Sequence, residues 1–344
     1  MNTVNRISTI SEFLLHAGTE HLVIDVSRGR QLIDNQVFFD IENTKYPFPR
    51  PRQNCAWLCI MFWNKQASNE HYIWYLKLPL DERGLMQIAA RDQFLQILLE
   101  ALGNKMQIDD SLDRGLPENP FIFEPSQQMR ADCNAMLKKR LDMPLSDNAQ
   151  LATQYLISPE IIDWRELSVQ HLADAIANLD EKVIERISSE QLKRFPTAVL
   201  NALFSGFEGI ELNEKSSVNI AAFVKDSAEY TRAMALRAMS HGEKSVCRAL
   251  LEDLFAMDDP LDLELLVVIA GRHWQHLGDE ELLAKYLNKV LSIDGQENLF
   301  QGIYADLVSI PEIRPTVLSL FNNAQLEPKL QEHLNEIKMR IQAV

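Results

Sequence analysis

Turn-forming residues are scarce in this chain of 344 residues. It contains 12 glycines and 14 prolines, and their combined share lies well below the average of about 12%. Because glycine and proline dominate turns, this scarcity favours helices over many short strands. Hydrophobic residues make up 46% and charged residues 24%, a balance that allows a sizeable core and excludes wholesale disorder.

Long apolar segments are also missing. The longest apolar run, Ala56 to Trp63, has the length of a strand, whereas a membrane-spanning helix needs about 18 or more apolar residues. Near the N-terminus only Phe13 to Leu15 form an apolar patch, which is too short for a secretory signal. We therefore expect no membrane-spanning segment and a cytoplasmic location.

The few cysteines do not show the spacing of disulfide or metal sites. Cys55 and Cys59 lie on one expected strand, where about 3.3 Å per residue holds their Cα atoms about 13 Å apart, too far for a disulfide. No C-x-x-C motif is present in the sequence. We expect Cys55, Cys59, Cys133 and Cys247 to be reduced and structural.

Catalytic and nucleotide-binding motifs are absent from the sequence. It contains no Walker, dinucleotide-binding, nucleophile-elbow or H-E-x-x-H motif. A net charge of -15 and a pI near 5.0 argue against a general nucleic-acid binder, which needs clustered lysine and arginine. We therefore expect no cofactor, no metal and no nucleic-acid partner.

Residues 1–118 combine strand and helix patterns, and we expect an α+β domain with a small antiparallel sheet and flanking helices. Alternating side chains predict strands over His21–Val26, Cys55–Trp63 and His71–Leu78. The polar stretch Asn64–Glu70 predicts a hairpin loop between the last two. Both faces of the second strand are apolar, so we expect it to be covered on both sides.

A helix is expected to follow the last of these strands. Asp81 stands at an N-cap position, Leu80 and Leu85 take the hydrophobic-staple positions, and Gly103 ends the pattern. An apolar stripe should pack this helix on the sheet. Its members are Leu85, Ile88, Leu95, Leu98, Leu99 and Leu102.

Residues 119–344 show helix periodicity almost without interruption, and we expect an all-α domain. Breaks are expected about every 14 to 19 residues, so a pair of helices spans roughly 30 to 36 residues. This period is typical of HEAT or TPR repeats, although no TPR consensus is present. It predicts an irregular α-solenoid rather than a single four-helix bundle. The expected breaks lie near Gly242, Asp259, Gly278, Gly295, Pro311 and Gln325.

Most of the negative charge belongs to this second region. Residues 1–118 contain 12 basic and 15 acidic side chains, whereas residues 119–344 contain 22 and 34. The helical region should therefore present an acidic surface, which suits a basic or amphipathic protein partner.

Arginines form the first candidate binding surface. Arg28 and Arg30 lie in one expected turn, and Arg50 and Arg52 lie in a proline-rich connector. They are suited to an anion or an acidic partner. Solvated loop charge is the competing explanation, and it is the more common one for such clusters.

Trp63 belongs to an aromatic cluster on the two central strands. Such strand pairs usually pack in a core. If one face of the sheet lacks a covering helix, Trp63 would instead contribute to a homodimer interface. The other members of the cluster are Trp57, Phe62, Tyr72, Trp74 and Tyr75.

A second candidate surface surrounds Arg272 and Trp274, residue types that anchor many interfaces. A buried Trp274 is the competing expectation. His273 and His276 lie three residues apart, a spacing that a metal site can use, but no third ligand is fixed by spacing. Histidines near a helix end also complement the helix dipole, and we expect no metal there.

An enzyme is the alternative to a binding protein. Asp40, Glu42 and Lys45 loosely resemble a metal-dependent nuclease set, but the lysine lies too far after the glutamate for the usual motif. A hydrolase site at the junction of the two expected domains would use residues such as Asp25, Arg28 and Asp40.

Three parts of the chain resemble an uncharacterised proteobacterial family of about this length. They are residues 56–103, which begin AWLCIMFWN, residues 164–176, WRELSVQHLADAI, and residues 267–277, VVIAGRHWQHL. The resemblance extends over nearly the whole chain and implies a bacterial, soluble protein. It implies no activity, cofactor or catalytic residue.

These patterns together predict a non-enzymatic interaction or adaptor protein. Its acidic helical repeats would bind a protein partner whose identity the sequence does not give. The candidate protein-binding residues are Arg28, Arg50, Arg52, Trp63, Arg272 and Trp274.

Overall fold

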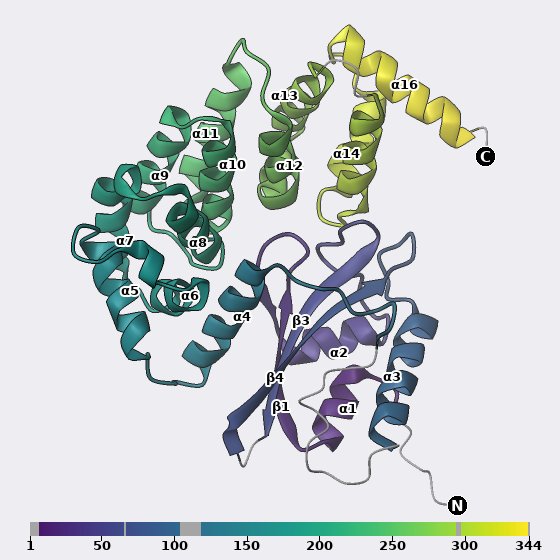
Figure 1. The fold of residues 1–344 in the computed structure, drawn as a ribbon. Helices are drawn as coiled ribbons and strands as arrows, with labels where there is room; N and C mark the ends of the chain where they lie inside the picture. The colour runs from purple at the N-terminus through teal and green to yellow at the C-terminus, as the bar shows by residue number, and fades with distance from the viewer. Residues whose placement is uncertain (1–6, 65–66, 104–117, 294–296, 343–344) are drawn as a thin grey trace, which may run out of the picture. The chain divides into compact units, whose positions relative to one another are not determined.

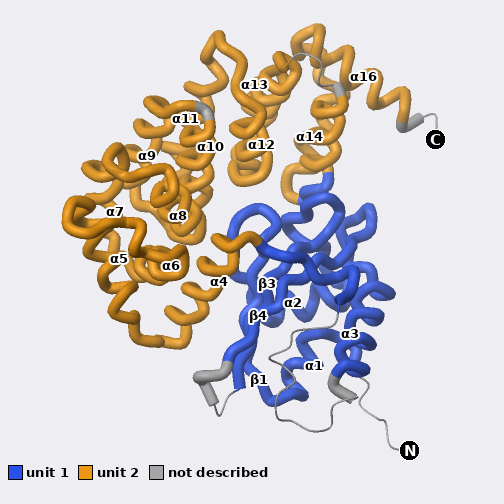
Figure 2. Tube along the Cα trace, viewed as in Figure 1, with its two compact units in different colours: residues 1–125, 309–311 blue, residues 126–308, 312–344 orange. Residues whose placement is uncertain are grey.

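The computed structural model describes residues 7–64, 67–103, 118–293 and 297–342. The chain divides into two compact units (Figure 2). Unit 1 comprises residues 1–125 and 309–311, and unit 2 comprises residues 126–308 and 312–344.

Unit 1 contains a four-stranded antiparallel sheet in the order β2-β1-β3-β4 (Figure 1). This confirms the small antiparallel sheet predicted from the alternating side chains. The predicted pairing of the last two strands is confirmed, but the loop expected over Asn64–Glu70 is too long, because the last strand already begins at Ala67. The strands are β1 Thr19–Asp25, β2 Gln31–Ile33, β3 Cys55–Asn64 and β4 Ala67–Pro79.

The described residues of unit 1 form three helices, α1 Ile10–His16, α2 Asn35–Glu42 and α3 Ile88–Gly103. The helix start predicted at Asp81 is wrong, since α3 begins only at Ile88. The Asp81 carboxylate accepts hydrogen bonds from the N–H groups of Arg83 and Leu85 and closes a turn instead. Gly84 within this turn has a φ of 82°, a left-handed conformation that a helix cannot contain.

The helices of unit 1 bury one face of the sheet. Phe94, Leu95 and Leu98 of α3 are buried, whereas Ile88 and Leu99 of the predicted stripe are 49% and 45% exposed. The buried face of α3 therefore differs from the predicted stripe, since it includes Phe94 and excludes Ile88 and Leu99. These side chains share a core with α1, α2, β3 and β4, including Ile10, Phe38, Leu58, Ile60 and Leu76.

The regular elements in the described residues of unit 2 are all helices. None of the described helices of the chain is both long and apolar enough to cross a membrane. Several helices of unit 2 begin at polar N-cap residues, among them Ser126, Asp262 and Asp279. The helices are α4 Gln127–Arg140, α5 Asp147–Ile157, α6 Val169–Ala177, α7 Glu181–Arg186, α8 Thr197–Phe207, α9 Glu214–Asp226, α10 Glu229–Ala238, α11 Lys244–Ala256, α12 Leu263–Arg272, α13 Glu280–Leu291, α14 Glu297–Ser309, α15 Arg314–Ser319 and α16 Pro328–Gln342.

The predicted helix breaks agree with these bounds. Gly242 follows α10 and a 3-10 turn, and Gly278 ends the 3-10 helix η5, Trp274–Gly278. Pro311 lies between α14 and α15, and Asp259 lies between α11 and α12. The predicted break at Gly295 falls outside the described residues. Breaks are recognisable because glycine, proline and N-cap residues locate them independently of tertiary packing.

Packing within unit 2 follows the order of the helices along the chain. α6 contacts α8, α8 contacts α10, and α10 contacts α12. A second series joins α7 to α9, α9 to α11, and α11 to α13. α10 and α12 lie side by side in Figure 1.

Candidate functional site

Two of the four predicted arginines, Arg28 and Arg50, take part in a polar cluster that follows β1. Arg50 Nε lies 2.6 Å from the Asp25 carboxylate, which also accepts a 2.8 Å hydrogen bond from the N–H of Ser27. Arg28 Nε donates to the carbonyl of Pro51 at 2.9 Å. We call Asp25, Ser27, Arg28 and Arg50 the Asp25 cluster.

The Asp25 cluster is internal rather than an exposed basic surface. Asp25 and Arg28 are 1% and 3% exposed. Burial raises the pKa of the Asp25 carboxyl, and the Arg50 charge and the Ser27 N–H oppose this shift. The expectation that Arg28 is a solvated loop charge is therefore wrong, because its guanidinium is buried and donates a hydrogen bond to a backbone carbonyl. The cluster therefore fixes the turn that follows β1.

Arg52 is the exposed member of the predicted arginine set. Its guanidinium carbon lies 5.1 Å from the ring centre of Trp57, and Lys77 Nζ lies 4.7 Å from the same ring. Trp57 also packs edge-on against Phe123, with ring centres 4.8 Å apart. Two cations over one half-buried indole are typical of a stabilising cation–π arrangement.

Trp63, Arg272 and Trp274 lie largely inside their units. Trp63 is 8% exposed and Trp274 is 3% exposed, which agrees with the packing alternatives. Arg272 pairs with Glu208, a 1% exposed carboxylate that also binds Arg237 Nε at 2.6 Å. None of these three candidate side chains offers a large contact surface.

Glu42 has a structural role that the nuclease comparison did not anticipate. Its carboxylate accepts hydrogen bonds from the N–H groups of Ile10 and Ser11, at 2.6 and 3.1 Å, and from the Ser11 hydroxyl at 2.5 Å. Burial raises its pKa to about 7, although these hydrogen bonds act in the opposite direction. Asp40 pairs instead with Lys45 at 2.7 Å. Asp40, Glu42 and Lys45 therefore do not form a shared, exposed site of the nuclease type.

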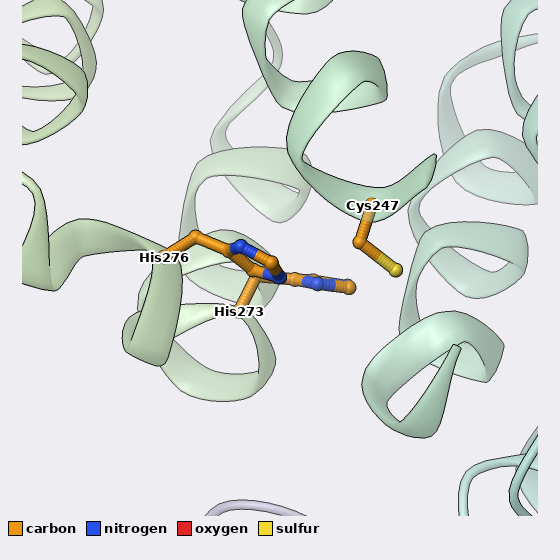
Figure 3. Close-up of side chains that lie close together, drawn as sticks. All are labelled: Cys247, His273 and His276. Carbon is orange, nitrogen blue, oxygen red and sulfur yellow. The ribbon is translucent and has the colours of Figure 1, made fainter. Parts of the chain in front are cut away.

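Three potential metal ligands converge in unit 2. Cys247 lies in the first turns of α11, His273 follows the end of α12, and His276 lies in η5. One ligand atom from each residue lies within 4.8 Å of the other two (Figure 3). We call this group the Cys247 cluster.

Burial disfavours the charged form of all three groups of the Cys247 cluster. It lowers the pKa of His273 to about 4. It also lowers the pKa of His276, and the Arg248 and Lys244 charges lower that pKa further. Burial and the Glu243 charge raise the pKa of the Cys247 thiol to about 12. Sequence spacing indicated only the two histidines, because Cys247 joins them through the packing of separate helices.

A groove in unit 2 is the second feature that the sequence did not indicate. It has a volume of about 940 Å³ and lies at the start of α10 and α12 and just after α13. Its lining combines apolar side chains with two acidic ones, Asp259 and Asp262. The lining residues are Ala228, Tyr230, Arg232, Asp259, Pro260, Leu261, Asp262, Leu263, Ser292 and Ile293.

The sequence family described as "Protein of unknown function (DUF3549)" matches residues 5–338. The match covers nearly the whole chain, so the chain belongs to this family. It agrees with the resemblance found from the sequence segments and names no activity. No curated protein and no solved structure matches the chain.

Proposed function

We propose that this member of the family is a non-enzymatic protein-binding protein whose helical unit holds a basic, amphipathic segment of a partner. The binding site would be the groove formed by α10, α12 and the end of α13. The observation that carries this proposal is that exposed apolar and acidic side chains occur together along one groove.

The apolar part of the groove is unusually accessible. Tyr230 is 52% exposed and Leu263 is 43% exposed. Val267, one turn further along α12 and outside the lining of the groove, is 52% exposed. Apolar side chains that remain exposed in a concave surface favour partner binding, and an amphipathic helix typically places its apolar face on such a groove.

The acidic side chains at the groove favour a partner segment of positive charge. Asp259 and Asp262 line it, and the exposed acids Asp258 and Glu264 flank these two residues. Arg232, the cation of the lining, donates two hydrogen bonds to the Ser227 carbonyl. A partner segment with lysine or arginine beside its apolar face would therefore gain electrostatic complementarity.

The arrangement of unit 2 supports an irregular α-solenoid of the HEAT or TPR kind. Polar contacts between separate segments of unit 2 recur at similar sequence separations: Lys138 with Asp174 at 36 residues, Arg194 with Glu160 at 34, and Arg248 with Asp279 at 31. These separations are close to the predicted repeat of two helices, roughly 30 to 36 residues. Solenoids commonly bind proteins along their extended surfaces.

The hydrolase alternative receives no support from the polar groups proposed for it. Asp25 is buried in a hydrogen-bonded cluster, and Asp40 is engaged with Lys45. The homodimer alternative relied on Trp63, whose side chain is only 8% exposed and offers little surface for contact. We therefore favour a basic segment of another protein as the occupant of the groove.

Site-specific crosslinking in the full chain tests this proposal. A photo-crosslinking amino acid at Tyr230 should capture a partner segment that carries basic residues next to apolar ones. A synthetic peptide of that segment should then bind the purified protein. Leu263→Ser should weaken binding about tenfold or more, as expected for a central apolar contact.

Leu151→Ser is the matched control. Leu151 lies on α5 and is 41% exposed, close to the 43% of Leu263, but it is not part of the groove lining. This variant should keep the affinity of the unmodified protein. Equal weakening by both substitutions, or a captured segment without basic residues, would contradict the proposal.

A further inference from the structure

We propose that Cys247, His273 and His276 form a binding site for one zinc-type divalent ion, which ties α11 to the segment that follows α12. The site lies within unit 2 and is separate from the groove. It is independent of the proposed partner binding, since neither set of residues includes a member of the other.

The spacing of the ligand atoms suits a small tetrahedral ion. One atom from each residue lies within 4.8 Å of the other two. Metal–ligand bonds of about 2.0 to 2.3 Å place neighbouring ligand atoms of a tetrahedral zinc site roughly 3.3 to 3.6 Å apart. Side-chain movements on the order of 1 Å would close this difference. In Figure 3 the Cys247 side chain points toward the two imidazoles.

A hydrogen bond fixes the tautomer of His273. Its Nε2 lies 2.9 Å from the carbonyl oxygen of Leu236. A carbonyl only accepts, so Nε2 carries the proton and Nδ1 keeps its lone pair. Metal-binding histidines typically donate their other ring N–H to a carbonyl or carboxylate in this way.

The position of the Cys247 sulfur depends on Gly242. A Cβ at Gly242 would lie 3.0 Å from Cys247 Sγ and 3.1 Å from the Met239 carbonyl, closer than ordinary van der Waals contact. Glycine therefore leaves room for the thiol beside the histidines.

The chemistry of the cluster favours a metal over a cysteine nucleophile. Cys247 is 2% exposed and its thiol has a raised pKa, about 12, so it is poorly suited to attack a substrate. A divalent ion can displace the thiol proton, because its charge stabilises the thiolate directly. One thiolate and two imidazoles form a ligand set typical of zinc.

Charged groups of both signs surround the cluster, and Arg272 acts on His273 as a further cation. Lys244 and Arg248 face His276 and oppose a cation. Arg248 is paired with Glu252 at 2.9 Å and with Asp279 at 3.2 Å, and Glu243 acts on the Cys247 thiol from the other side. His276 is the half-buried ligand, so an ion would enter along its side and a water molecule would complete the coordination.

Cobalt substitution in the full-length protein tests the site. Chelator-treated protein should bind one equivalent of Co²⁺ and develop both the visible bands of four-coordinate cobalt and a near-ultraviolet thiolate-to-cobalt charge-transfer band. Zn²⁺ should displace the cobalt and remove both signals. Wild-type protein without the charge-transfer band would overturn the proposal, whatever the behaviour of the variants.

Substitutions identify the ligands. Cys247→Ala should remove the charge-transfer band, and His276→Ala should weaken Zn²⁺ binding at least 100-fold, since loss of even a supporting residue costs about 10- to 100-fold. Cys133→Ala and His333→Ala serve as controls and should retain the spectrum and the affinity. Circular dichroism establishes that each variant is folded. Unchanged affinity in folded His276→Ala would also overturn the assignment.

Discussion

The carboxylate of Glu42, at the end of α2, accepts a 2.6 Å hydrogen bond from the backbone N–H of Ile10, the first residue of α1. The N–H and hydroxyl of Ser11 donate to the same carboxylate. The first N–H groups of a helix lack partners within the helix. Glu42 therefore satisfies the start of α1 and joins it to α2, which explains why this acid is fully buried.

The stability contributed by Glu42 should depend on pH. Burial raises its pKa from 4.5 to about 7 in the folded protein. The folded state therefore holds a proton that the unfolded chain releases in this range. The resulting stabilisation is complete below pH 4.5 and is lost as the pH rises through about 7. The difference amounts to about 3 kcal/mol at about 1.4 kcal/mol per pKa unit.

Urea unfolding of wild type and Glu42→Gln at several pH values measures this effect. The amide cannot titrate, and its NH₂ group would face donors at Ser11, so the variant should be less stable at low pH. The advantage of the wild type should shrink as the pH rises from about 4.5 to about 7. The exposed Glu82→Gln serves as control. A difference independent of pH would contradict the raised pKa.

Removal of Arg50 should destabilise unit 1 strongly. Arg50 is the ion-pair partner of the 1% exposed Asp25 at 2.6 Å. Loss of one member of a buried pair leaves an uncompensated charge and costs about 3 to 5 kcal/mol. We expect this loss for Arg50→Met and a partial recovery in Asp25→Asn/Arg50→Met. Tryptophan fluorescence in urea reports it, because Trp57, Trp63 and Trp74 belong to unit 1.

An exposed ion pair provides the comparison for Arg50. The side chains of Lys193 and Asp226 are 73% and 65% exposed and lie 3.1 Å apart. Such pairs contribute about 0 to 1 kcal/mol, so Lys193→Met should leave the free energy of unfolding nearly unchanged. Similar losses in both variants would indicate that the burial of Asp25 has no special effect.

Two glycines at equivalent helix positions should respond oppositely to alanine. Gly206 and Gly271 are each the last residue but one of their helices, α8 and α12. A Cβ at Gly206 would overlap Ile176 of α6, whereas a Cβ at Gly271 would meet nothing within 4 Å. Gly206→Ala should cost about 1 to 3 kcal/mol through overpacking.

Gly271→Ala should be neutral or gain up to about 1 kcal/mol, because alanine is the better helix former. Thermal unfolding followed by circular dichroism should therefore give a lower midpoint for Gly206→Ala and an equal or higher one for Gly271→Ala. A higher midpoint for Gly206→Ala would show that α6 and α8 are not in close contact at Ile176.

The sequence predicted the strands of unit 1 well where apolar residues formed long uninterrupted patterns. β3 and β4 pair in register from Cys55 with Pro79 to Trp63 with His71, as the two aromatic runs indicated. The helix start at Asp81 failed because a carboxylate that accepts nearby N–H groups is common to N-caps and to turns. The positive φ of Gly84 requires a turn at this position. The amino-acid composition does not reveal that backbone angle.

Binding features were less predictable, because they depend on contacts between distant segments. Arg28 and Arg50 were expected in solvent as loop residues, but Pro51 and Asp25 bind their guanidinium groups. The spacing of His273 and His276 was visible in the sequence, but their contact with Cys247 results from packing between helices. Local patterns carry no information about such pairs.

Charge reversal in the groove should reveal how much of the proposed partner binding is electrostatic. Asp259 is exposed and lines the groove, whereas the neighbouring Asp262 also caps α12 through the N–H of Leu265. Asp259→Lys therefore changes the charge of the groove without removing a helix cap. The affinity for the captured basic peptide should fall, and it should become less sensitive to salt, since one attractive charge is replaced by a repulsive one.

Glu211→Lys introduces the same change of charge at an exposed residue between α8 and α9 that does not line the groove. Fluorescence anisotropy at several salt concentrations should show nearly unchanged binding for this control. Because both variants have the same net charge, a difference between them isolates the local field of the groove from the overall acidity of the chain. Equal losses in both would indicate long-range attraction alone, and the groove would then not be the binding site.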